Sequence, residues 1–237
     1  MDKPIVVMKR YELKYILSKE QTDYLVESLK GHMEIDKFGL TSIASLYYDT
    51  PDYRLIRSSI EKLDFKEKIR LRSYGLATQD SSVFLELKRK YDEVVYKRRV
   101  QTTIPQVANF FDFEGEICAD GQIARELKYF RNFYENLSPA CLIIYDRTAY
   151  FEQDGDLRLT IDYNPRYRTT DLNLTTSMEG ISLLPEGYTI LEVKVQQAMP
   201  MWLSKILSDG KIYKNSFSKY GSAYKKQMIN LKKVGNL

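Results

Sequence analysis

The chain has little cysteine, tryptophan or histidine: its 237 residues include two cysteines, one tryptophan and one histidine. Cys118 and Cys141 lack the spacing of a metal-binding motif, and without a secretory signal we expect their thiols to stay reduced. Residues 1–8 lack the apolar segment of a signal peptide. No apolar run approaches the roughly 20 residues of a membrane-spanning helix. We therefore expect a cytoplasmic protein with no membrane span in this chain.

Charged residues and tyrosine, by contrast, are plentiful. Charged residues make up 29% and hydrophobic residues 43% of the chain, which indicates a folded protein and not a disordered one. Nineteen tyrosines with only 11 glycines favour strands. This length suits a single all-β domain, so we predict one domain over residues 1–237. The net charge of +4 says little about partners, but the basic residues cluster inside predicted strands.

Alternation and turn residues predict about eight strands with flanking helices. Ser18, followed by Gln21, has the spacing of a capping box at the start of a helix that ends near Gly31. Eight strands can close a sheet, so we predict an α+β fold, a closed eight-stranded antiparallel β-barrel with flanking helices. The expected strands are residues 7–17, 43–48, 66–74, 83–90, 94–103, 142–152, 157–163 and 188–195, and the other helices are 122–136, 200–207 and 218–232, with loops at 105–121 and 169–187.

Charged residues recur at every second position of these strands, so they share one face. In residues 66–74, Lys68, Arg70 and Arg72 alternate with apolar residues. The opposite face carries leucine, isoleucine, valine or tyrosine on nearly every strand. If that apolar face packs outward against the helices, the charged face points into the barrel. The alternative is an open sheet whose charged face meets solvent.

An enclosed face of this kind would hold far more basic than acidic side chains. Isolated buried charges are very costly, so such an interior requires a polyanion. Triphosphate fits, because arginine binds phosphate oxygens in a fork and lysine adds point charge. Glutamates fit a hard divalent cation on the same phosphates. The nine basic candidates are Lys14, Arg70, Arg72, Lys88, Lys97, Arg147, Arg158, Lys194 and Lys219, and the three acidic ones are Glu12, Glu86 and Glu192, a surplus of six positive charges.

Several stretches, in this order along nearly the whole chain, resemble the VTC domain family of the CYTH-like triphosphate tunnel metalloenzyme superfamily. They are residues 9–15 (KRYELKY), 47–50 (YYDT), 68–72 (KIRLR), 86–88 (ELK), 145–149 (YDRTA), 157–162 (LRLTID), 191–194 (LEVK) and 217–220 (FSKY). The resemblance implies an eight-stranded tunnel and ATP-dependent polyphosphate synthesis. In that reaction the end of a polyphosphate chain attacks the γ-phosphate of ATP.

The resemblance also implies roles for individual residues. Glu192 matches the family's metal-binding glutamate, and Glu12 and Glu86 are further candidates to hold Mn²⁺ or Mg²⁺. Ser216 stands where the family's eukaryotic members carry a basic residue. The expected catalytic residues are Arg70, Arg72, Lys88, Arg147 and Arg158. The expected phosphate-binding residues are Lys14, Lys97, Tyr145, Lys194, Ser218 and Lys219.

Three functions are compatible with the sequence. The first is a polyphosphate polymerase, a phosphotransferase. The second is a metal-dependent triphosphatase or nucleoside triphosphate hydrolase of the same superfamily. Such hydrolases usually begin with Glu-x-Glu-x-Lys, whereas here Arg10 takes the place of the first glutamate, which argues against this function. The third is a non-catalytic module that binds polyphosphate or another polyanion.

We expect ATP and polyphosphate, or triphosphate, as partners, with a membrane-protein partner left open. Nucleic acid is not expected, because alternation divides the bases of residues 88–90 and 97–99 between two faces. Some site residues have simpler explanations. Glu12 and Glu86 could pair only with lysines, and Arg147 could be purely structural. Tyr145 could be a packing residue, and Lys219 a solvated helix lysine.

Overall fold

A computed structural model describes residues 11–92, 94–112, 115–117, 119, 121–153, 155–196 and 198–234. Residues 7–10, which we predicted to begin the first strand, lie outside these ranges, as does Cys118. The chain divides into two compact units, and each is described by itself. Unit 1 comprises residues 1–41, 146–164 and 184–217, and unit 2 comprises residues 42–145, 165–183 and 218–237. The single domain over residues 1–237 stays a prediction.

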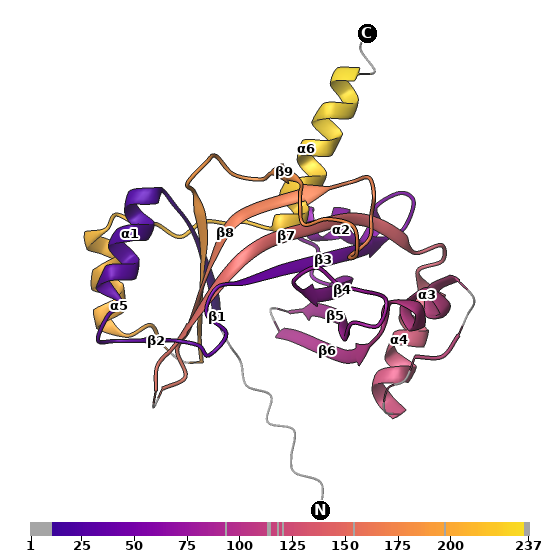
Figure 1. Ribbon diagram of the computed structural model, residues 1–237, viewed down its shortest axis with the longest axis horizontal. Helices are drawn as coiled ribbons and strands as arrows, with labels where there is room; N and C mark the ends of the chain where they lie inside the picture. Colours follow the sequence, from indigo (N-terminus) through magenta and orange to yellow (C-terminus); the bar gives the residue numbers. More distant parts are fainter. Residues whose placement is uncertain are drawn as a thin grey trace, which may run out of the picture. The chain divides into compact units, whose positions relative to one another are not determined.

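All eight predicted strands are present, and every pairing whose register is described is antiparallel (Figure 1). The hydrogen-bonded order is β1-β10-β8-β7-β3-β4-β5-β6, with the two-residue strands β2 on β7 and β9 on β8. The bounds are β1 Tyr11–Leu17, β2 Glu34–Ile35, β3 Thr41–Asp49, β4 Lys66–Tyr74, β5 Val83–Tyr91, β6 Val94–Thr102, β7 Ser138–Phe151, β8 Arg158–Arg168, β9 Ile181–Ser182 and β10 Thr189–Val195.

The predicted closure of the sheet into a barrel is wrong. In the described part of the chain the strand order ends at β1 and at β6, which do not pair, so the sheet is open. Eight strands permit closure, but closure also requires hydrogen bonds between the first and last strands, and side-chain alternation does not encode these. β6 carries the exposed side chains Tyr96, Lys97 and Arg99, and charge on an edge strand opposes further pairing.

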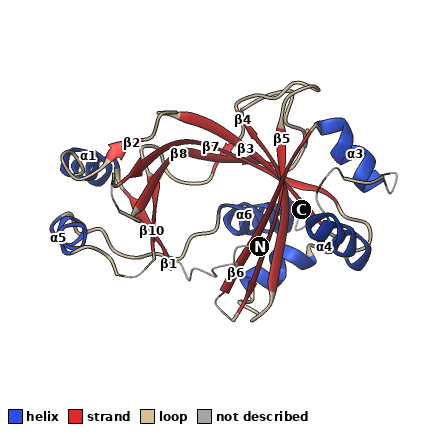
Figure 2. Cartoon of the chain, turned by 90° about the horizontal axis from the view of Figure 1, so that it is seen from below, coloured by secondary structure: helices blue, strands red, loops and turns tan. Residues whose placement is uncertain are grey.

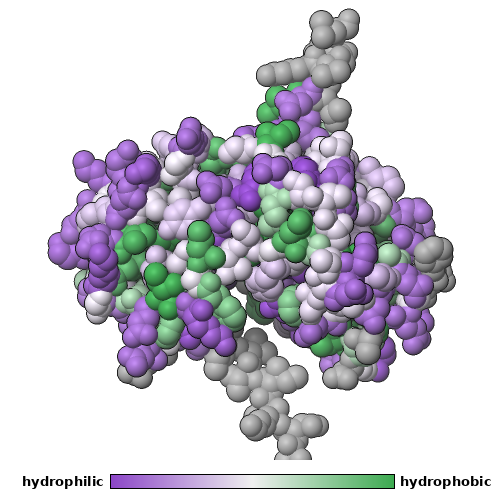
Figure 3. Space-filling model, viewed as in Figure 1, coloured by the Kyte–Doolittle hydropathy of each residue, from purple (hydrophilic) through white to green (hydrophobic). Residues whose placement is uncertain are grey.

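In unit 1, helices α1 (Lys19–Ser28) and α5 (Met201–Asp209) lie side by side (Figure 2). The predicted capping box is confirmed: Ser18 Oγ accepts from the Gln21 N–H at 3.3 Å, and the Gln21 side chain accepts from the Ser18 N–H at 3.0 Å. Gln21 Nε2 also donates to the carbonyl of Gly210 at 3.1 Å. This hydrogen bond satisfies a carbonyl that the C-terminal end of α5 leaves without a partner in the helix. The outer surface at α1 is mainly hydrophilic (Figure 3). The helices share one core with the apolar faces of β1, β8 and β10, which includes Leu17, Leu25, Leu159, Leu191 and Leu203.

Replacing Ser18 by alanine is expected to lower the free energy of unfolding by about 1 kcal/mol, because the cap hydrogen bond is lost. Thermal unfolding of the two proteins checks this value. Ser28→Ala is the matched control, since Ser28 stands half-buried at the other end of α1 and its hydroxyl donates to the helix carbonyl of Tyr24. Equal unfolding temperatures for Ser18→Ala and Ser28→Ala would contradict a capping role.

In unit 2, helices α3 (Ile104–Asp112) and α4 (Gly121–Phe133) share a core with the apolar faces of β3, β4 and β5. We predicted α4 but expected a loop where α3 lies. Pro105 is compatible with a helix there because it stands in the first turn, where its missing N–H is not needed. The core includes Leu46, Leu71, Leu85, Leu87, Val107, Phe110, Leu127 and Phe130. The charged residues of β4 and β5 that alternate with these leucines therefore occupy the other face.

A buried carboxylate, Asp49, joins three elements of unit 2. It ends β3 and accepts from the N–H groups of Leu55 at 2.9 Å and Ile56 at 3.0 Å, which begin helix α2 (Arg54–Ile60). It also accepts from the hydroxyl of Tyr220 at 2.9 Å, in the first turn of helix α6 (Lys219–Val234). Burial raises the pKa of Asp49 despite these hydrogen bonds. α6 is therefore fixed to β3 and α2 at its N-terminal end. In the described residues, no helix is both long and apolar enough to cross a membrane.

Candidate functional site

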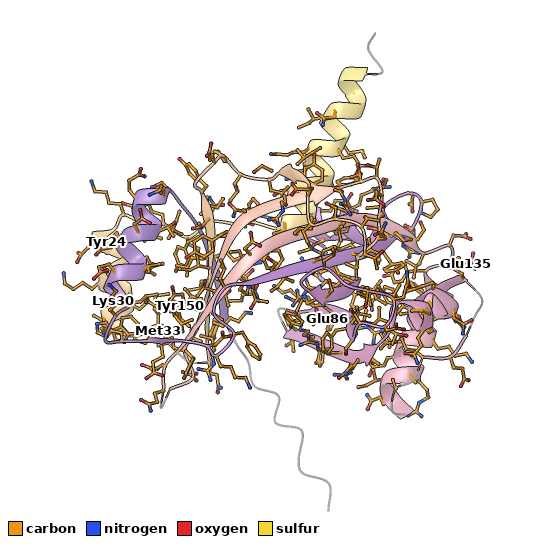
Figure 4. All side chains as sticks on the ribbon, viewed as in Figure 1. Tyr24, Lys30, Met33, Glu86, Glu135 and Tyr150 are labelled. Carbon is orange, nitrogen blue, oxygen red and sulfur yellow. The ribbon has the colours of Figure 1, made fainter. Side chains whose placement is uncertain are left out.

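The Glu86 cluster of unit 2 consists of Glu86 and the four bases that surround it, Arg70, Arg72, Lys97 and Arg99. The side chain of Glu86, labelled in Figure 4, is only 2% exposed. Its carboxylate lies 2.8 Å from Arg70 Nη2 and 2.8 Å from Lys97 Nζ. Arg99 Nε follows at 3.5 Å and Arg72 Nε at 3.7 Å. The registers explain this convergence, because Glu86 stands opposite Arg70 on β4 and opposite Arg99 on β6.

Hydroxyl groups hold the two arginines of β4 in place. Arg70 Nη1 donates to the Tyr47 hydroxyl at 2.7 Å. Arg72 donates to Ser45 Oγ and to the Tyr145 hydroxyl, each at 3.3 Å. Tyr145 therefore contacts a cluster arginine through its hydroxyl, which goes beyond a packing role. Fixed guanidinium groups lose little entropy when they bind an anion.

The charges of the Glu86 cluster are unbalanced: four cations face one carboxylate, a surplus of three positive charges. Burial alone would raise the pKa of Glu86, but Arg70, Arg72 and Lys97 outweigh it and lower the pKa to about 2. The same two arginines have an unfavourable effect on the charged form of Lys97. Burial and the charges of Arg70 and Arg72 lower its pKa, although Glu86 acts to raise it. An added anion would relieve this repulsion.

The basic face of unit 2 continues from the Glu86 cluster towards α6. Lys68 and Lys88 stand opposite each other on β4 and β5, and Lys88 stands opposite Lys97 on β6. Lys68 Nζ donates to Ser218 Oγ at 3.5 Å, and Ser218 caps α6 by accepting from the Gly221 N–H at 3.2 Å. The ammonium of Lys219 lies 4.5 Å from the centre of the Tyr145 ring. The structure therefore gathers Ser218, Lys219 and Lys68 at the N-terminal end of α6, where anions are favoured, and Lys88 stands next to Lys68.

The Glu192 cluster of unit 1 contains the acids Glu12, Asp162 and Glu192 and the bases Lys14, Arg147 and Lys194. Lys14 Nζ lies 3.3 Å from Glu12 and 3.3 Å from Glu192. Arg147 Nη2 donates to Asp162 at 2.8 Å and lies 3.6 Å from Glu192. Lys194 Nζ is 3.8 Å from Glu192. Three acids balance three bases, so this cluster lacks the positive surplus of the Glu86 cluster. Burial alone would lower the pKa of Lys14, but Glu192 and Glu12 raise it.

Asp162 is absent from the site residues predicted from the sequence. It is fully buried and forms a two-point ion pair with Arg147. This geometry favours the alternative that Arg147 is structural. The alternation of Arg158, Thr160 and Asp162 placed Asp162 on the charged face, and this was the one available signal. Arg158 itself is exposed and lies 5.3 Å from the ring centre of Phe151.

The carboxylates of the two clusters differ in their fitness for a divalent metal. The described residues contain no group of three or more His, Cys, Asp or Glu side chains placed to hold one. Mg²⁺, however, is commonly bound by one or two carboxylates together with substrate phosphates. Glu12 and Glu192 fit that requirement, since both reach the same Lys14 ammonium. Glu86 fits poorly, because it is buried among four cations. Its surroundings favour the alternative of pairing only with bases, and the metal roles stay predictions.

The comparisons with known proteins establish the family of this chain. The VTC domain family matches residues 9–228. The chain belongs to the VTC domain family. Over 211 residues it is 25% identical to the vacuolar transporter chaperone complex subunit 4 of Schizosaccharomyces pombe. The match covers 70% of this chain and 29% of that protein, so the chain spans less than a third of this relative's length. The resemblance found in the sequence is thereby confirmed.

Solved structures share the fold. An adenylate cyclase-like protein of Bacillus halodurans is similar with a TM-score of 0.53 at 14% identity, covering 89% of this chain and 96% of that one. An adenylyl cyclase-like protein of Hippeastrum, described as having a dominant triphosphatase activity, has a TM-score of 0.51 at 16% identity, covering 88% and 92%. Roles in catalysis or phosphate binding remain predictions for every residue of the two clusters.

Proposed function

We propose that this chain transfers the γ-phosphate of ATP to the end of a polyphosphate chain. The observation that supports this most directly is the surplus of three positive charges around the buried Glu86. A polyanion is the ligand that such a surplus favours, because it restores charge balance to groups partly removed from water. Membership of the VTC domain family, together with the similarity to a vacuolar transporter chaperone subunit, adds support.

Phosphoryl transfer requires positioning and charge neutralisation more than covalent chemistry by the protein. Arg70 and Arg72 are held by Tyr47, Ser45 and Tyr145, so their guanidinium groups are oriented before a substrate arrives. They would bind the non-bridging phosphate oxygens and stabilise the charge that develops on them. Lys97 would add a point charge, and its ammonium would gain stability when phosphate enters. Lys88, Lys68, Ser218 and Lys219 would hold the phosphates nearest α6.

Glu12 and Glu192 would hold Mn²⁺ or Mg²⁺. When bound, the metal supplies further neutralisation of charge on the phosphate oxygens. Lys14 lies between these two carboxylates and keeps them in place when they hold no other cation. Lys194 and Arg158 would contribute positive charge on the same face of unit 1, whereas Arg147 stays paired with Asp162.

A metal-dependent triphosphatase is the second candidate. The Hippeastrum structure with a described triphosphatase activity shares this fold, and the same basic residues would serve with water as the acceptor. Incubating the purified protein with ATP and Mn²⁺ or Mg²⁺, followed by electrophoresis for polyphosphate, separates the alternatives. Long chains support synthesis, whereas orthophosphate or pyrophosphate alone supports hydrolysis. Binding of ATP or polyphosphate without turnover would support a non-catalytic module.

Arg70→Lys is expected to slow turnover about tenfold, because lysine keeps the charge but loses the two-point hydrogen bonds to phosphate and to Glu86. Arg98→Lys is the matched control: Arg98 pairs with Glu126 at 3.1 Å on the opposite face of β6. Initial rates at saturating and limiting ATP would show whether kcat or KM changes. Equal rates for the two variants would contradict phosphate binding by Arg70.

A further inference from the structure

The basic face of unit 2 ends in an aromatic group at the side away from α6. The guanidinium carbon of Arg99 lies 3.8 Å from the centre of the Phe84 ring and 5.6 Å from that of Tyr74. Arg99 also donates to the Tyr74 hydroxyl at 2.8 Å. The two rings meet edge to face at 5.8 Å. We call Tyr74, Phe84 and Arg99 the aromatic platform.

The platform remains accessible although its members contact one another. The side chain of Arg99 is 36% exposed, and Tyr74 is 48% exposed. Gln101 is exposed as well, and it stands opposite Phe84 on β6. An exposed guanidinium plane that rests on a ring offers its other side for stacking. The amide of Gln101 would offer both a donor and an acceptor at the edge of that surface.

The register places the platform at one end of the proposed phosphate-binding residues. Phe84, Glu86 and Lys88 follow one another at two-residue steps on the same face of β5. Each step spans about 6.7 Å, so Phe84 and Lys88 are separated by about 13 Å along the strand. Arg72 stands opposite Phe84, Arg70 opposite Glu86, and Lys68 opposite Lys88. An extended nucleoside triphosphate has a comparable length from its base to its γ-phosphate.

We propose that the aromatic platform binds the nucleobase of the nucleoside triphosphate. The base stacks on the guanidinium of Arg99, which Phe84 supports from beneath, and Tyr74 contacts its edge. The α-phosphate then lies near Arg72, and the terminal phosphate lies towards Lys68 and Lys88. This inference rests on the proposed function, since it requires that the Glu86 cluster binds the phosphates. It adds the direction in which the nucleotide lies.

The test compares ATP with inorganic tripolyphosphate, which carries phosphates but no base. Both affinities are measured by titration calorimetry for the wild type, for Tyr74→Ala and for Phe84→Leu. Phe84→Leu keeps an apolar side chain beneath Arg99 but lacks the ring that supports the guanidinium. Each substitution is expected to weaken ATP about tenfold and to leave tripolyphosphate within about twofold, because stacking on a base contributes roughly 1–3 kcal/mol. Tyr96→Ala is the control, an exposed tyrosine of β6 on the opposite face.

The outcomes separate this inference from the proposed function. If the variants weaken ATP and tripolyphosphate equally, or weaken neither, the platform does not bind the base, and phosphate binding by the cluster stands. If the wild type binds neither ligand, both proposals are overturned. If the platform variants bind ATP more weakly but bind tripolyphosphate as the wild type does, and Tyr96→Ala binds both normally, the platform binds the base.

Discussion

Glu192→Gln is expected to reduce metal-dependent turnover about 100-fold or more, because the amide removes one of the two carboxylates that would hold the cation. The substitution preserves shape, and the backbone pairing of β10 with β1 and β8 does not depend on the charge. We therefore expect the circular dichroism spectrum to remain unchanged. Rates measured across a titration of Mn²⁺ would show a higher metal requirement together with a lower maximum.

Glu126→Gln is the matched control for this experiment. Glu126 also bridges two cations, Arg89 and Arg98, each at 3.1 Å, but it stands on α4 and belongs to neither cluster. Its loss should leave the metal titration unchanged. If Glu192→Gln retains wild-type turnover at every metal concentration, Glu192 does not hold the metal.

Acid is expected to weaken unit 2 through Glu86. The folded protein lowers the pKa of this carboxyl from 4.5 to about 2, so its contribution to stability is fully present above pH 4.5. That contribution is lost as the pH falls towards about 2, where the carboxyl becomes protonated in the folded state too. A shift of this size corresponds to about 3 kcal/mol of unfolding free energy. Urea unfolding at a series of pH values between 7 and 2 would measure the loss.

Glu86→Gln tests the assignment of this pH dependence to one residue. At pH 7 the variant is expected to be about 3 kcal/mol less stable, because four cations lose their buried partner. Its unfolding free energy should then decline less steeply below pH 4.5 than that of the wild type. Tripolyphosphate should stabilise the variant more than the wild type, since the surplus of positive charge has grown by one. Parallel pH profiles for the two proteins would assign the acid sensitivity to other carboxyls.

The alternation of side chains along β4 and β5 was enough to predict which residues share a face. On this basis Arg70 and Arg72 were predicted to lie on one face of β4 and Leu71 on the other. The packing of Leu71 in the core of unit 2 confirms this prediction. The capping box at Ser18 was equally local, since both its hydrogen bonds join residues three positions apart. Patterns within a few residues of each other were therefore sufficient for these features.

Features that depend on distant residues were not predictable in the same way. Helix α2 begins after Tyr53, which has a left-handed backbone with φ of 58° and makes no side-chain cap. The helix N–H groups of Leu55 and Ile56 are satisfied by Asp49, and that of Arg54 by the Thr50 hydroxyl, so the residue directly before the helix gives no start signal. The pairing of Asp162 with Arg147 joins β8 to β7, and sequence alternation does not give the register between two strands. The prediction of a closed sheet was wrong for the same reason, because closure depends on hydrogen bonds between edge strands that are distant in the sequence.

The hydrogen bond between Tyr220 and Asp49 has a practical consequence for shortened versions of this chain. Because α6 is attached at its first turn, removing residues from its far end leaves Ser218, Lys219 and their contacts with Lys68 and Tyr145 in place. A tag or truncation beyond residue 230 should therefore be harmless, because it also spares the hydrogen bonds of Lys226 and Gln227 to the rest of unit 2. Ending the chain at Phe217, by contrast, would delete Ser218 and Lys219 and expose the Asp49 carboxylate, with damage to both binding and folding.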